Sequence, residues 1–221
     1  MGQFNKPNAT YLTVSEGKFI SACEKGKHNI ERTADDGTTK YGFATNAFES
    51  MLTNITIEPG QYGKQFIFHW ADDDGTTYKM PMKYGSNLAN SFLNSLAGVV
   101  AKHGKMVSLR LTASAKVHNG KTYTNIFIND RTNENIKWKY DWKTDIPAIT
   151  RTVNKRGDEI VDDEARLEFF DKVLENEILP ALRKVSPAEA KLGLADGQAH
   201  TPAPVNTPVN APANDDDDIP F

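Results

Sequence analysis

The chain has 221 residues, of which 38% are hydrophobic, and its net charge is -3 at pH 7. This length and composition allow one substantial core with appendages, or at most two small domains. No apolar run approaches the roughly 18 residues of a transmembrane helix, and the N-terminus lacks the pattern of a signal peptide, so we expect a cytoplasmic protein that does not bind membranes. The single Cys23 and the scattered histidines exclude a disulfide and a cysteine-rich zinc site, so we expect no metal and no cofactor.

The charge is distributed unevenly along the chain. Residues 1–150 contain 18 Lys and Arg against 14 Asp and Glu, a net charge of +4. Residues 151–221 contain 8 against 15, a net charge of -7. The body therefore favours anionic partners, whereas the C-terminal part is acidic.

Alternating apolar residues predict three successive strands at 51–60, 62–70 and 76–83. The second and third strands are joined by an Asp74-Gly75 turn, which is typical of a hairpin. A similar Asp-Gly turn lies upstream at 36–37, where residues 8–48 have the pattern of further extended segments. These segments are predicted to form an N-terminal β extension.

A helix is predicted at 85–104, with Ser86 as its cap and Gly104 at its end. Two strands follow at 106–117 and 121–130, and Asn119-Gly120 is a strong signal for the hairpin between them. The segment 135–142 is predicted to add a sixth strand. The order of three strands, a helix and two strands is that of the OB-fold, a five-stranded Greek-key barrel that binds oligonucleotides. We therefore expect a mainly β protein with an OB-fold body at residues 1–150.

The last 71 residues divide into three predicted parts. Residues 151–186 are expected to be helical, because apolar residues recur every three or four positions from Leu167 to Val185, and Pro180 should bend or divide this helix. Residues 187–214 are rich in Pro and Ala and contain no aromatic residue, so a disordered tether is expected. Residues 215–221 form an acidic tip, DDDDIPF.

Proteins that hold single-stranded nucleic acid without reading its sequence need aromatic rings for the bases and cations for the phosphates. Rings and cations of this kind lie near probable strand ends and loops. The candidates are Trp70, Tyr78, Lys79, Lys83, Tyr84, Lys105, Arg110, Lys116, Lys121, Tyr123, Phe127, Trp138 and Trp142. The alternative reading of each ring is core packing, which we favour for Phe66, Phe68 and Phe92.

The carboxylates Asp72, Asp73 and Asp74, together with Asp35 and Asp36, are the strongest signal for an enzyme, a metal-dependent nuclease. Consecutive strand residues point to opposite faces, however, so three in a row do not chelate one ion. Asp before Gly is also what a hairpin turn requires. We therefore expect a turn and no catalytic residues.

The C-terminal sequence carries the most specific signal. Four carboxylates, Asp215, Asp216, Asp217 and Asp218, precede the apolar residues Ile219, Pro220 and Phe221. Such an end can dock in a small apolar pocket that is rimmed by Lys and Arg, and Pro220 limits the entropy lost on binding. This tip resembles that of bacterial-type single-stranded DNA-binding proteins, and the extra N-terminal strands make the layout more similar to phage-encoded members.

The resemblance implies a non-enzymatic protein that binds single-stranded DNA during replication, recombination and repair. It also implies that residues 215–221 recruit replication and repair proteins and compete with DNA for a basic groove. Monomers and homo-oligomers are both compatible with the sequence. The alternatives are an RNA-binding or strand-annealing protein on the same barrel, the nuclease, and an adaptor that binds only proteins.

Overall fold

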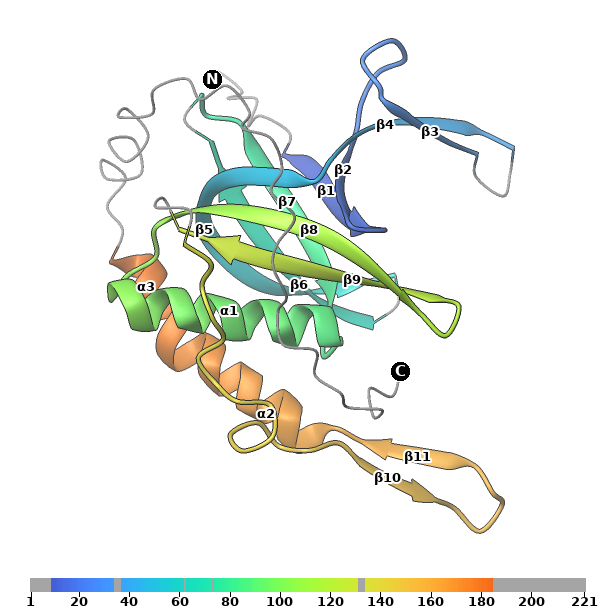
Figure 1. Ribbon diagram of the computed structural model, residues 1–221, viewed down its shortest axis with the longest axis vertical. Coiled ribbons are helices and arrows are strands. Elements are labelled where there is room, and N and C mark those ends of the chain that lie inside the picture. Colours follow the sequence, from blue (N-terminus) through green and yellow to red (C-terminus); the bar gives the residue numbers. More distant parts are fainter. Residues whose placement is uncertain (1–8, 34–36, 62, 73, 131–133, 185–221) are drawn as a thin grey trace, which may run out of the picture.

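A computed structural model of the chain describes residues 9–33, 37–61, 63–72, 74–130 and 134–184. The protein is mainly β, as predicted, and is built around one mixed sheet of nine strands (Figure 1). The order across the sheet is β3-β4-β2-β1-β7-β6-β5-β8-β9, and every neighbouring pair is antiparallel except the parallel pair β1 and β7. The strands are β1 (Thr10–Ser15), β2 (Lys18–Ala22), β3 (Ile30–Thr33), β4 (Thr39–Thr45), β5 (Ala47–Gly60), β6 (Gly63–Ala71), β7 (Thr77–Lys83), β8 (Ser108–His118) and β9 (Lys121–Asn129).

Local sequence signals place the central elements correctly. The predicted order of three strands, a helix and two strands is confirmed as β5, β6, β7, α1 (Asn87–His103), β8 and β9. The Ser86 hydroxyl caps α1 by accepting a hydrogen bond from the Ala89 amide, and Gly104 ends the helix. Asn119 and Gly120 both have positive φ angles, 48° and 74°, as a two-residue type I′ hairpin requires.

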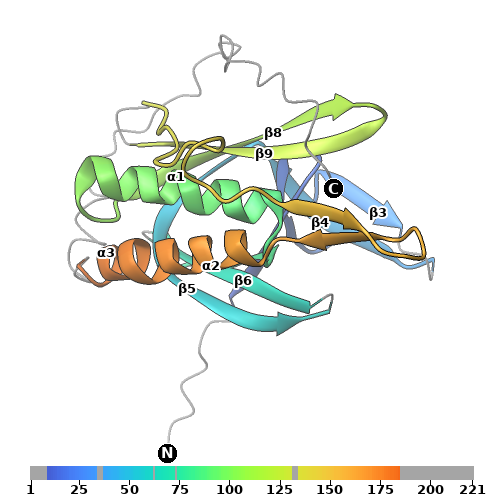
Figure 2. The same cartoon turned by 90° about the horizontal axis from the view of Figure 1, so that it is seen from below.

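The inner face of the sheet holds the core. Phe66, Phe68 and Phe92 are at most 1% exposed, which confirms their assignment to the core. The Phe92 ring of α1 meets the Phe68 ring of β6 edge to face, with 4.9 Å between ring centroids. A second helical run lies beside α1, and the two runs together cover this side of the sheet (Figure 2). We call the opposite, solvent-facing side of the sheet the outer face.

The second helical run consists of α2 (Glu164–Val173), a π-helical turn η1 (Leu174–Ile178) and α3 (Leu179–Arg183). Pro180 lies at the start of α3, which confirms that it divides the helix, because proline cannot donate to the carbonyl four residues earlier. Two tyrosines tie this run to the body. Tyr84 donates a hydrogen bond to Asp171 Oδ2 at 2.5 Å, and Tyr140 donates one to Glu177 Oε1.

The sheet curls so that its N-terminal strands approach β8 and β9. The turn between β1 and β2 presses against β8, where a Cβ on Gly17 would lie 2.4 Å from the Ala115 nitrogen. The Gly17 amide also donates to Thr124 Oγ1 of β9 at 3.4 Å. Among the described residues, β7 pairs with β1 and not with β9, so the pairing that would close a five-stranded barrel is replaced by this contact.

Two parts of the predicted layout need correction. The segment 135–142 is not a sixth strand; the described residues form only an isolated bridge between Asn129 and Asn135 there. Residues 151–186 are not helical throughout, because they begin with a β-hairpin of β10 (Thr150–Val153) and β11 (Glu159–Asp162) that projects from the body (Figure 1).

The predicted tether at 187–214 and the tip at 215–221 lie outside the described residues. Within the described part of the chain, no helix is both long and apolar enough to cross a membrane.

Candidate nucleic-acid interface

Strands β8 and β9 bring five of the predicted binding residues onto one face. The antiparallel register pairs Lys116 with Tyr123, Thr112 with Phe127 and His118 with Lys121. Residues that are directly opposite in an antiparallel pair point to the same side, and residues two apart on a strand do so as well. Arg110, Lys116, Lys121, Tyr123 and Phe127 therefore share one side of the two strands, which we call the ribbon face.

Burial of the opposite side fixes this orientation. Leu109, Leu111 and Ile128 are at most 1% exposed and belong to the core. Slipping the register by one residue would turn these side chains out to solvent, and the two-residue turn at 119–120 also sets the register. Arg110, Lys116 and Lys121 are exposed, whereas the rings of Tyr123 and Phe127 are half-buried. The ribbon face thus presents two aromatic rings, with Lys116 and Lys121 near Tyr123 and with Arg110 beyond Phe127.

The central strand β7 adds two more predicted cations to the outer face. Lys79 and Lys83 alternate with the buried Met80 and Met82, so they point away from the core. Lys79 is paired with His69 on the neighbouring strand β6. Burial, assisted by the Lys79 ammonium, lowers the pKa of His69 below its usual value. His69 is therefore neutral at pH 7, and Lys79 is the charge at this position.

Trp70 was wrongly predicted as a binding residue. Its side chain is 1% exposed, and its ring meets the Phe48 ring edge to face at 5.6 Å. The sequence placed it correctly before a turn, but its strand position, two residues after Phe68, turns the ring into the core.

Tyr78 and Tyr84, which are also predicted binding residues, are half-buried and pack against the core. Tyr78 alternates onto the inner side of β7 and packs edge to face on Phe48, with 5.2 Å between ring centroids. Burial and the Asp72 carboxylate raise the pKa of Tyr78 to about 12. The Tyr84 ring packs on Phe66, with 4.9 Å between ring centroids, and its hydroxyl donates a hydrogen bond to Asp171.

The remaining predicted residues lie elsewhere. Trp138 and Trp142 are in a loop, with ring centroids 5.7 Å apart. Trp142 is held on Phe170 and beneath the Arg166 guanidinium, while Trp138 is 46% exposed. Lys105 is exposed in the turn after α1. These three residues therefore lie outside the two strands of the ribbon face.

Three cations of the outer face were missed in the sequence. Lys18, Arg32 and Lys40 lie on β2, β3 and β4, and register with their neighbours places them on the same side as Lys79. Their strand positions could be read from the sequence, but not the side of the sheet that each strand presents. The outer-facing acidic residues of the strands are Glu49 and Glu58, so positive charge dominates this side among the described residues.

Asp72 and Asp74, two of the carboxylates that could indicate a nuclease, shape a turn, whereas Asp35, Asp36 and Asp73 lie outside the described residues. The Asp72 amide donates to the Thr76 carbonyl, and the Thr76 amide donates to Asp74 Oδ1 at 2.8 Å. That second hydrogen bond is the main reason why the pKa of Asp74 lies below its usual value. No group of three His, Cys, Asp or Glu side chains among the described residues is arranged to hold a metal ion.

No family model, curated protein or solved structure matches the chain. The chemistry of the site therefore follows from its own residues. A face with exposed cations beside half-buried rings can neutralise phosphates and stack on bases. The predicted partner-binding residues 215–221 lie outside the described part of the chain.

Proposed function

We propose that this protein binds single-stranded DNA without sequence specificity during replication, recombination and repair, and that it acts without catalysis. The observation that carries the proposal is the ribbon face, where Arg110, Lys116 and Lys121 accompany the rings of Tyr123 and Phe127 on one side of two strands. Single-strand binders combine these two kinds of side chain in the same way.

The strand order supports an OB-type body as the scaffold. In that fold the outer face of the second and third strands and the adjoining hairpin loops hold the nucleic acid. The corresponding strands here are β6 and β7, with Lys79 and Lys83 on the outer face, and β8 with β9 forms the last hairpin. We propose a decorated version of this barrel, in which β1 and β2 occupy the gap between β7 and the ribbon.

The sequence of the tip supports a second role. Residues 215–221, DDDDIPF, resemble the acidic tips by which single-stranded DNA-binding proteins recruit replication and repair enzymes. Four carboxylates repel one another, which keeps the apolar end available to a partner. The same charge competes with DNA for the basic outer face.

Fluorescence anisotropy with labelled oligonucleotides tests the binding. The protein is expected to bind a thymidine oligomer far more tightly than a duplex of equal length at the same salt concentration, because stacked bases in a duplex are not free for Tyr123 and Phe127. Equal affinity for both would contradict the proposal. A uridine oligomer in the same titration separates DNA binding from RNA binding, since a preference for RNA would favour the alternative function.

Deletion of residues 215–221 tests the role of the tip. The shortened protein is expected to bind the thymidine oligomer as tightly as the full chain or more tightly, because four competing carboxylates have been removed. Loss of binding on this deletion would show that the tip belongs to the DNA site and does not serve only to recruit partners.

A further inference from the structure

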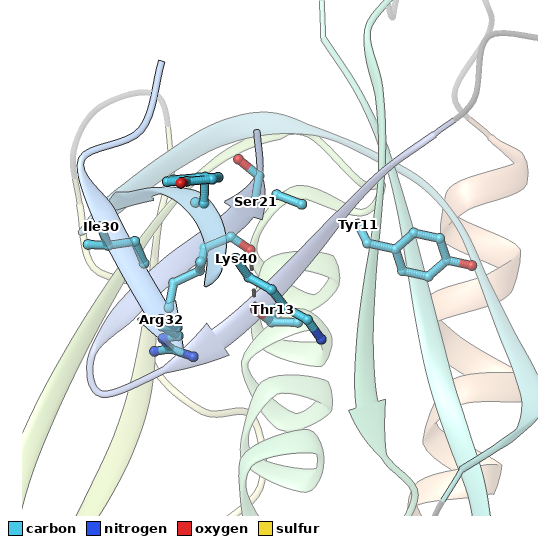
Figure 3. Close-up of a pocket in the computed structure, with 10 residues that line it drawn as sticks. Tyr11, Thr13, Ser21, Ile30, Arg32 and Lys40 are labelled. Atoms are coloured by element: carbon cyan, nitrogen blue, oxygen red, sulfur yellow. Dashed lines mark hydrogen bonds between the residues drawn. The ribbon is translucent and has the colours of Figure 1, made fainter. Parts of the chain in front are cut away.

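The N-terminal strands line a half-open hollow that the proposed function does not use. It has a volume of about 190 Å³ and is lined by residues of β1, β2, β3 and β4. Figure 3 shows Ile30 and Arg32 on one side of it and Tyr11 at its opposite edge, where the Tyr11 ring points away from Ile30 and Arg32. The register pairs Thr13 with Ile20, Ile30 with Gly42, and Arg32 with Lys40, which places these side chains on the outer face.

The floor of the hollow is apolar and lies close to the backbone. Ile20 and Ile30 approach Gly42 so closely that a Cβ there would lie 3.2 Å from Ile20 Cγ2 and 3.3 Å from Ile30 Cγ1. Because Gly42 has no side chain, Ile20 and Ile30 can pack directly against the backbone of β4. Apolar cavities of about 150 Å³ accept a benzene ring, so the hollow has room for one aromatic ring system.

The rim carries two cations that face each other. Arg32 and Lys40 are directly opposite in the antiparallel pair of β3 and β4, and both are exposed. Like charges in such positions destabilise a sheet unless an anion lies between them. Among the described residues, neither side chain forms an ion pair with a carboxylate. The arrangement is complementary to one phosphate group.

Tyr11, at the edge of the hollow, connects it with the rest of the outer face. Tyr11 is 57% exposed, although large aromatic side chains are usually more buried. It is the register partner of Lys79 on β7, so ring and cation stand side by side on neighbouring strands. From β1 to β4 is two strand spacings, about 10 Å, a span that a single nucleotide can bridge.

We infer that this hollow is a nucleotide subsite, in which one base of a single strand lies over Ile20 and Ile30 while Arg32 and Lys40 hold its phosphate, and the next base stacks on Tyr11 at the edge of the hollow. The inference rests on the proposed function and extends it, because it adds the N-terminal strands to the binding track. A single strand that runs past Lys79 on β7 continues onto β1 and ends in the hollow.

Titration of the full chain with thymidine oligomers of increasing length tests the subsite. Tyr11→Ala is expected to weaken binding of long oligomers about 5- to 150-fold, the range for one stacked base, and to leave the shortest bound oligomers unaffected. The double variant Arg32→Gln, Lys40→Gln is expected to lower the salt slope by about 0.7, the value for one phosphate on a single strand.

Phe43→Ala provides the matched control. Phe43 is 50% exposed on the same strand as Lys40, but it has the opposite parity and points away from the hollow. Its loss is expected to change neither the affinity nor the length dependence. Circular dichroism and thermal melting of each variant establish that it is folded, and photo-crosslinking with 4-thiothymidine is expected to label Tyr11.

The outcomes separate the two proposals. If the wild-type chain binds no single strand, the proposed function fails. If it binds, but folded Tyr11 and Arg32/Lys40 variants match it at every length and no crosslink reaches Tyr11, only the subsite is overturned. The subsite is also overturned if these variants bind DNA more tightly than the wild-type chain does and as tightly as the chain without residues 215–221. That result would show that the hollow holds the acidic tip and not a nucleotide.

Discussion

The cations of the ribbon face lead to a quantitative prediction for salt dependence. Arg110 and Lys116 are exposed on the outer side of β8. Each phosphate that is neutralised on a single strand contributes about 0.7 to the slope of log K against log salt concentration. The double variant Arg110→Gln, Lys116→Gln is therefore expected to reduce the slope by about 1.4.

The same relation gives the loss of affinity. One lost phosphate contact weakens binding about eightfold at 50 mM salt and about threefold at 200 mM, so the double variant should lose about 60-fold and about 10-fold respectively. Anisotropy titrations of a thymidine oligomer at four or five salt concentrations measure both quantities. The structure predicts little change in stability, because both side chains are solvated.

A charge-matched control distinguishes the ribbon face from the overall charge. Lys172→Gln with Lys184→Gln removes the same charge from the C-terminal helices, on the other side of the sheet from the ribbon face. This variant should keep the wild-type slope. If both double variants change the slope equally, the ribbon face is not the phosphate track, and the reasoning from register to function is wrong.

Three further predictions concern stability. Tyr84→Phe should lower the free energy of unfolding by about 1.5–3 kcal/mol in urea denaturation, because it removes the hydrogen bond that the Tyr84 hydroxyl donates to the Asp171 carboxylate. An unchanged midpoint would contradict this. For Tyr78, burial and the Asp72 carboxylate raise the pKa from 10 to about 12, so the folded state favours the neutral phenol. The stability from this group is complete below pH 10 and is lost as the pH rises to about 12, so Tyr78→Phe should flatten the pH dependence between denaturation curves at pH 9 and 11. Gly17→Ala should lower the free energy of unfolding by more than the about 1–2 kcal/mol that a left-handed alanine costs, because the new Cβ would clash with the β8 backbone. A smaller loss of stability on thermal melting would show that the β8 backbone moves to make room.

Some features of the fold were fixed by short stretches of sequence. Ser86 and Gly104 delimit α1 because a hydroxyl cap and a left-handed glycine act within one helical turn. Asn119-Gly120 defines the β8–β9 hairpin, and through its register it also brings Lys116 and Tyr123 onto one face. Each of these signals depends on residues that are neighbours in the chain, so the sequence alone determines them.

Other features depended on contacts between distant residues. Trp70 and Tyr78 are adjacent to the same turn, but their parity relative to the core, and not their nearness to a loop, decides that Trp70 is buried and that Tyr78 is half-buried against it. The β10–β11 hairpin was missed because its strands are short and lie next to a strong helical pattern, although Gly157 at its turn was a usable signal.

The sequence by itself determined the mainly β character, the order of the central elements, and a basic body with an acidic end. Only the tertiary structure decided that β1 pairs in parallel with β7, which places Tyr11 beside Lys79 and adds the N-terminal strands to the outer face. A parallel pair joins segments that are far apart in the chain, and no local turn specifies it. The ribbon face could therefore be read from alternation and one hairpin turn, whereas the hollow beside Tyr11 required the assembled sheet.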